Sequence, residues 1–186
     1  MIRDAERTRK RLLEAATAEF AELGIAGARV NRIAEVAGCN KAMLYAYYGS
    51  KDLLFDAVFT AHVAEFLERV PFDAGDLPAY AGRLHDYFEE NPAAQRLAVW
   101  YRLERPGSAH LDAVVDINRT RLDEVARAQA EGVLADHYPP AALLALVQAV
   151  STSWSSMNPE FDVFAPADRD RRRAAVVDAV RRLTAP

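Results

Sequence analysis

The chain has 186 residues, of which 51% are hydrophobic and 27% are charged, and its formal net charge is -4. This composition is typical of a soluble globular protein, and no stretch approaches the roughly 18 consecutive apolar residues that a membrane span requires. The single cysteine, Cys39, excludes an internal disulfide and has no companion at metal-ligand spacing. Because the N-terminus also lacks the apolar run of a signal peptide, we expect a cytoplasmic protein.

Apolar residues recur at spacings of three and four nearly throughout, which predicts an all-α fold. The first helix is expected over 4–23, with Gly24 as its C-terminal cap. A short second helix follows over 30–37. Glycines and prolines fall mostly between these periodic segments, where turns are expected.

The third helix is predicted over 41–48, with a cap at each end. Asn40 can accept a backbone N–H of the first turn, and Gly49 can end the helix in a left-handed turn. Ser50 is then the expected cap of a fourth helix over 51–70. The pattern therefore predicts two short helices between two longer ones.

A break follows at 71–78, where Pro71, Gly75 and Pro78 interrupt the apolar pattern. We place a domain boundary here: residues 1–50 form a first domain that continues into the linking helix 51–70, and residues 71–186 form a second helical domain. The fold should contain about nine helices, and those of the second domain are predicted over 77–90, 92–104, 110–136, 140–157 and 166–183.

The two short helices have the arrangement of a helix-turn-helix DNA reader. On the third helix, Leu44 and Tyr48 are four residues apart and can face the core, which leaves another face for DNA. A helix in a groove must offer cations to phosphates and short or flat side chains to base edges. This mixture is supplied by Lys41, Ala42, Met43, Tyr45 and Tyr47.

Charge is distributed unevenly along the chain. Residues 1–53 contain nine Lys and Arg against seven Asp and Glu, a balance of +2, so the remainder carries -6. All three lysines lie in the first part. This placement indicates an anionic partner for the N-terminal end only.

Residues 27–58, "GARVNRIAEVAGCNKAMLYAYYGSKDLLFDAV", resemble the DNA-binding region of the TetR family of bacterial transcriptional regulators. The resemblance rests on several short runs in register without a gap: Ile33-Ala34, Ala37-Gly38, Leu44-Tyr45-x-Tyr47-Tyr48 and Ser50-Lys51-Asp52-x-Leu54. Beyond the first 60 residues or so, it rests on helix number and length alone.

The resemblance implies DNA contacts by Asn40, Lys41, Met43, Tyr45 and Tyr47, with Lys51 at a phosphate near the start of the fourth helix. The chain departs from the family where Thr or Ser usually enters the second helix. Ala28 and Arg29 stand there, so that cap is absent and Arg29 is expected to contact a phosphate instead.

The C-terminal helices carry aromatic side chains and isolated polar groups, a combination typical of a pocket for an apolar small molecule. For each of these residues the alternative is an ordinary place in the core. This alternative is favoured for Asn118 and His62, and also for the aromatic residues Tyr87, Trp100, Tyr101 and Trp154. The candidate pocket residues are His62, Phe66, Tyr87, Trp100, Tyr101, Asn118 and Trp154.

The last two helices resemble the pair through which TetR-like regulators form a four-helix dimer interface. Small residues beside an apolar stripe permit close approach of helices. The candidate interface residues are Val147, Val150, Ser151, Trp154, Val176, Val180 and Leu183.

Catalytic motifs are absent from the sequence, so we expect no enzyme, no metal site and no cofactor. The predicted function is that of a ligand-responsive repressor that binds a palindromic operator in double-stranded DNA as a homodimer, with an unknown small-molecule effector and no membrane contact. The alternative is a helical small-molecule carrier or protein-interaction scaffold without DNA binding. Salt-sensitive binding to duplex DNA distinguishes the two.

Overall fold

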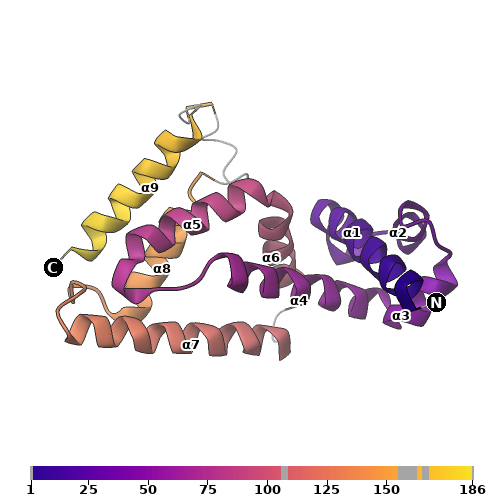
Figure 1. Ribbon diagram of the computed structural model, residues 1–186, viewed down its shortest axis with the longest axis horizontal. Helices are drawn as coiled ribbons and strands as arrows, with labels where there is room; N and C mark the ends of the chain where they lie inside the picture. The colour runs from indigo at the N-terminus through magenta and orange to yellow at the C-terminus, as the bar shows by residue number, and fades with distance from the viewer. Residues whose placement is uncertain (1, 106–108, 155–162, 165–167, 186) are drawn as a thin grey trace. The chain divides into compact units, whose positions relative to one another are not determined.

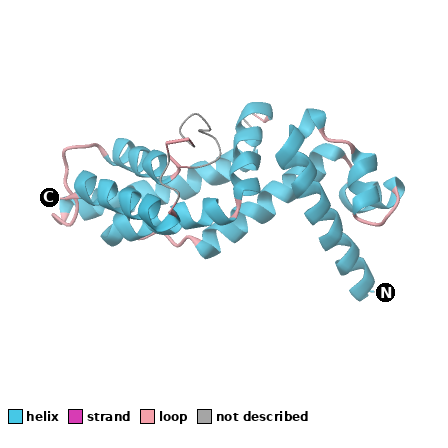
Figure 2. Ribbon diagram, turned by 90° about the horizontal axis from the view of Figure 1, so that it is seen from above, coloured by secondary structure: helices cyan, strands magenta, loops and turns pink. Residues whose placement is uncertain are grey.

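The computed structural model describes residues 2–105, 109–154, 163–164 and 168–185 (Figure 1). Within these ranges every regular element is a helix, which confirms the predicted all-α fold (Figure 2). None of the helices in the described ranges combines the length and the apolar character that crossing a membrane requires.

Nine α-helices and one 3-10 turn make up the described chain. In order they are α1 (Ile2–Gly27), α2 (Val30–Val36), α3 (Lys41–Tyr48), α4 (Lys51–Arg69), η1 (Ala74–Asp76), α5 (Leu77–Glu90), α6 (Pro92–Glu104), α7 (Ala109–Ala130), α8 (Pro140–Ser151) and α9 (Arg169–Thr184). They form two compact units. The first unit comprises Met1–Glu65 and Ala93–His110, and the second comprises Phe66–Pro92 and Leu111–Pro186.

The units are not continuous in sequence, because nearly all of α6 belongs to the first unit. The sequence had suggested a single boundary near residue 70 and gave no sign of this return. The functional division at that boundary stays a prediction.

Several helix ends differ from those predicted. Helix α1 passes Gly24, whose φ of 69° is left-handed as a C-cap requires, but the chain then winds one more turn to Gly27. Helix α7 ends at Ala130 rather than 136, because Gly132 turns the chain with a φ of 73°. Helix α8 ends at Ser151 and residues 152–154 form a turn, whereas the last part of its predicted range, 155–157, lies outside the described residues.

The core of the first unit is apolar and aromatic. Leu12, Phe20, Leu44 and Phe55 are fully buried, and the rings of Phe20 and Phe55 meet edge to face with centroids 5.1 Å apart. Burial of one such side chain stabilises the fold by about 1.5–3 kcal/mol. This core joins α1, α3 and α4 and so fixes how α3 is presented.

In the second unit, α5 packs against both α8 and α9 (Figure 1). Gly82 permits the close approach of α9, since a Cβ at this position would lie 3.1 Å from a methyl group of Val177. Ion pairs reinforce the contact: Arg173 lies 2.7 Å from Asp86, and Arg172 lies 2.7 Å from Glu89.

Candidate nucleic-acid interface

Local hydrogen bonds fix both ends of α3. The Asn40 side chain accepts the Met43 N–H at 2.8 Å, and Gly49, with a φ of 76°, donates its N–H to the Tyr45 carbonyl at 2.8 Å. Ser50 then caps α4 by accepting the Leu53 N–H at 3.0 Å. All three predicted caps are therefore confirmed.

Two buried side chains hold α3 in place. Leu44 is fully buried and Tyr48 is 7% exposed. The Tyr48 hydroxyl donates to the Arg9 carbonyl at 3.3 Å, and burial raises the pKa of this phenol. These contacts set the rotation of α3 about its axis, so that the opposite face points to solvent.

The opposite face carries the residues predicted to meet DNA. Met43 is 40% and Tyr45 is 37% exposed, Lys41, Ala42 and Asn40 are exposed, and Tyr47 is half-buried. The Lys41 ammonium lies 5.7 Å from the centroid of the Tyr45 ring, within cation–π range. The face is thus cationic, aromatic and apolar, without a carboxylate of its own.

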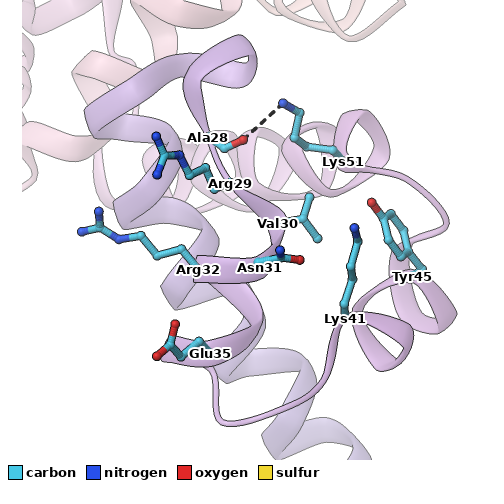
Figure 3. Close-up of a pocket in the computed structure, with 9 residues that line it drawn as sticks. All are labelled: Ala28, Arg29, Val30, Asn31, Arg32, Glu35, Lys41, Tyr45 and Lys51. Atoms are coloured by element: carbon cyan, nitrogen blue, oxygen red, sulfur yellow. Dashed lines mark hydrogen bonds between the residues drawn. The ribbon is translucent and has the colours of Figure 1, made fainter.

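A hollow between α2, α3 and the start of α4 continues this face (Figure 3). It brings together four predicted residues, Arg29, Lys41, Tyr45 and Lys51, whereas Asn40, Ala42, Met43 and Tyr47 lie elsewhere on or beside α3. Four cations and one carboxylate line it, a balance of +3. The full lining is Ala28, Arg29, Val30, Asn31, Arg32, Glu35, Lys41, Tyr45 and Lys51.

The contribution of α2 to this hollow was missed from the sequence. Asn31, Arg32 and Glu35 are exposed, whereas Ile33 and Ala34 are buried. The helical period of the buried pair already implied that the polar residues face outward. A polar face beside α3 could therefore have been predicted.

The four cations of the hollow differ in what they already contact. The Lys51 ammonium donates to the Ala28 carbonyl at 3.3 Å (Figure 3). It also donates to the Ala26 carbonyl at 3.4 Å, so it is held at the end of α1. Arg32 lies 3.1 Å from Glu19. Within the described ranges, Arg29 and Lys41 make no ion pair. These two cations are therefore the most available to an anion.

Glu19 replaces the missing cap of α2. The side chain of Arg29, the N-cap residue of α2, makes no capping hydrogen bond, as the sequence predicted. Instead, the buried Glu19 carboxylate, 4% exposed, accepts the Arg29 N–H at 3.0 Å and pairs with Arg32. A negative charge at a helix N-terminus is favourable. Its signal in the sequence was a charge within the apolar stripe of the first helix.

Helix α6 fixes the link between α1 and α2 from another side. Glu104 accepts the Ile25 N–H at 2.9 Å and the Ala26 N–H at 3.1 Å, which satisfies the turn that follows Gly24. The Trp100 indole donates to the Ala21 carbonyl at 3.3 Å. The backbone leading into α2 is therefore held by residues about 80 positions later in the chain.

The candidate pocket residues do not come together in one unit. Of the three in the first unit, Tyr101 is buried and stacks on Phe59 with centroids 3.8 Å apart, and Trp100 bonds to α1 as described. His62 lies 3.3 Å from the Thr17 hydroxyl, and burial lowers its pKa. The second unit holds the other four, Phe66, Tyr87, Asn118 and Trp154.

The candidate dimer residues are also of two kinds. Val147, Ser151, Val176 and Val180 are each at most 2% exposed, so they pack α8 and α9 within a single chain. Val150, Trp154 and Leu183 are half-buried and retain surface for a partner. On α8, further exposed apolar surface comes from Ala142, Ala145, Leu146 and Ala149, which the sequence analysis did not select.

Comparison with known proteins relates both parts of the chain to one group. The family model described as bacterial regulatory proteins, tetR family, matches residues 12–58, and the model described as tetracyclin repressor-like, C-terminal domain, matches residues 76–182. The HTH-type transcriptional repressor SCO4008 of Streptomyces coelicolor is 36% identical over 97% of both chains.

Solved structures agree. A transcriptional regulator, SCO4942, from Streptomyces coelicolor is 37% identical, covers 95% of this chain and 98% of its own, and superposes with a TM-score of 0.85. A TetR family transcription regulator from Marinobacter aquaeolei, 19% identical, shares the fold over the full length of both chains with a TM-score of 0.76.

Proposed function

The chain belongs to the TetR family of bacterial regulatory proteins, and on this basis we propose that it is a DNA-binding transcriptional repressor that acts in the cytoplasm. The observation that carries the proposal is the exposed face of α3. Leu44 and Tyr48 hold the helix rigidly, while Lys41, Met43 and Tyr45 project from its other side.

The chemistry of this face suits a major groove, which admits an α-helix. Lys41 and Arg29 have no carboxylate partner in the described ranges and can bind phosphates, which positions the helix. Met43, Tyr45 and Tyr47 offer apolar and aromatic surface to base edges, including thymine methyl groups. Asn40 and Ala42 lie at the start of α3, where recognition helices contact bases.

A homodimer is proposed because one α3 can read only one half-site. Two copies of α3 about 34 Å apart enter successive major grooves of a palindromic operator. The exposed side of α8, with Leu146 and three alanines, is apolar enough to join two chains together with α9. Val150, Trp154 and Leu183 lie at the edge of this surface.

We further propose that a small molecule regulates DNA binding from the C-terminal domain, residues 71–186. Such control requires unequal affinity of the effector for two conformations, typically about 1–3 kcal/mol of coupling. Four candidate pocket residues lie in the second unit, and we confine the effector site to that unit.

Lys41→Ala tests the reading face. The readout is fluorescence anisotropy with duplex DNA from upstream of the chain's own gene, measured over a range of salt concentrations. Loss of one phosphate contact should weaken binding about tenfold and reduce the salt slope by about 0.9. Arg119→Ala is the matched control, because Arg119 is an exposed cation on α7 whose ion pair in the described part of the chain is with the equally exposed Asp116.

Equal affinity of Lys41→Ala and wild type would remove this face from the interface. A wild-type protein whose interaction with duplex DNA is absent or insensitive to salt would instead support the carrier or scaffold function.

A further inference from the structure

Arg121 of α7 is a buried cation without a counterion in the second unit. It is only 6% exposed, and within the described ranges it makes no hydrogen bond and no ion pair. Its Nε is fully buried without an acceptor. Arginine remains charged inside proteins, and a buried charge is costly unless it is paired.

Three aromatic rings surround the Arg121 guanidinium. Its central carbon lies 5.3 Å from the centroid of Phe72 and 5.8 Å from the centroids of Phe66 and Tyr80. Cation–π attraction offsets part of the desolvation cost. It leaves the guanidinium N–H groups without acceptors, however, so the rings explain why the charge is tolerated but not what it binds.

The neighbouring polar groups are also donors without acceptors. Tyr80 of α5 is fully buried, and its hydroxyl has no partner in the described part of the chain. The Nε of Arg83, one turn later on α5, is likewise unpaired, although this guanidinium donates to the Pro71 carbonyl at 3.2 Å. Burial raises the pKa of Tyr80, while the positive charges of Arg121 and Arg83 lower it.

We propose that Arg121 and the Tyr80 hydroxyl bind the carboxylate of an organic monoanion whose apolar body lies against Phe66 and Phe72. A carboxylate is an acceptor-only group that accepts two N–H bonds from arginine in parallel, so it satisfies the donors that the chain leaves open. Phe66 and Phe72 are half-buried, so both rings still have exposed surface beside the guanidinium. A neutral ligand would leave the charge of Arg121 unmatched.

The identification of this anion as the effector rests on the proposed repressor function, but the site itself does not. Ligand binding is therefore measured by isothermal titration calorimetry on the full chain without DNA. The probes are 2-naphthoate and its neutral isostere, 2-naphthamide. DNA binding is measured separately without either probe, so failure of the repressor function and failure of the anion site give different results.

Wild type should bind 2-naphthoate at least tenfold more tightly than 2-naphthamide. Arg121→Met should remove this preference, and Tyr80→Phe, which deletes one hydroxyl, should weaken it several-fold. Arg119→Gln is the control for charge on the same helix, since Arg119 is exposed, and it should bind as wild type does.

Thermal unfolding separates binding from a structural role. Because Arg121 is buried and unpaired, Arg121→Met should unfold at the wild-type temperature or higher, and 2-naphthoate should stabilise wild type but not this variant. The proposal is overturned if wild type fails to bind 2-naphthoate at millimolar concentration or binds both probes equally. A clear fall in the unfolding temperature of Arg121→Met without ligand would also overturn it, because Arg121 would then be a packing residue.

Discussion

Replacement of Glu19 by alanine tests how α2 is held. Glu19 supplies the only side-chain acceptor described at the N-terminus of α2, through its bond to the Arg29 N–H. The change removes this acceptor and the ion pair with Arg32 together, and it leaves the helix without a cap.

The magnitude follows from these two contacts. A hydrogen bond to a charged group contributes about 1.5–3 kcal/mol. The ion pair adds less than about 1 kcal/mol, because the Arg32 side chain is 59% exposed. Glu19→Ala should therefore lower the free energy of unfolding by about 2–3 kcal/mol, and the melting temperature by about 5–10 °C for a chain of this size.

Urea denaturation followed by circular dichroism measures the loss. Glu14→Ala is the control on the same helix, because the Glu14 side chain is 63% exposed and pairs only loosely with Lys10 at 3.8 Å. It should change stability by less than about 0.5 kcal/mol. If Glu19→Ala were as mild as Glu14→Ala, the buried carboxylate would not be the cap that we describe.

Three further predictions concern backbone, charge and assembly. In urea denaturation, Gly24→Ala should lower the free energy of unfolding by more than about 3 kcal/mol, because Gly24 has a left-handed backbone and an added Cβ would lie 2.5 Å from a carboxylate oxygen of α6. Gly132 also has a left-handed backbone but open space around it, so Gly132→Ala should cost only about 1–2 kcal/mol. Burial alone would raise the pKa of Asp86, but hydrogen bonds and charges, chiefly from an α9 arginine, lower this pKa overall. The ionised Asp86 side chain should therefore stabilise the fold at pH 7, and this stabilisation should disappear as the pH falls below about 4. The urea midpoints of Asp86→Asn and wild type should converge at that low pH. Leu146→Arg, at an α8 position 37% exposed, should dissociate the dimer in sedimentation and abolish operator binding, and a wild-type sedimentation coefficient would exclude this surface from the interface.

The local signals of the sequence predicted the helix-turn-helix well. Asn40, Gly49 and Ser50 bound their helices as expected, because a cap depends on residues only a few positions away. Spacing alone identified Leu44 and Tyr48 as the buried side of α3. Whether the exposed residues contact DNA stays a prediction.

Contacts between distant residues could not be predicted. Glu19 and Glu104 act on backbone 10 and about 79 positions away, and helical periodicity carries no information on such pairs. For the same reason, the seven pocket candidates were grouped by residue type, and the fold divides them between two units. Arg121 was not selected, because a lone arginine on an otherwise amphipathic helix has no signal that separates it from a surface cation.

The return of α6 to the first unit limits how this regulator can be divided. A fragment that ends after α4 would lack the Glu104 carboxylate and would expose the faces of Phe55 and Phe59 that Tyr101 covers. The helix-turn-helix segment is therefore not a transferable module of some 60 residues. A chimera that grafts it onto another effector domain must carry residues 93–105 as well.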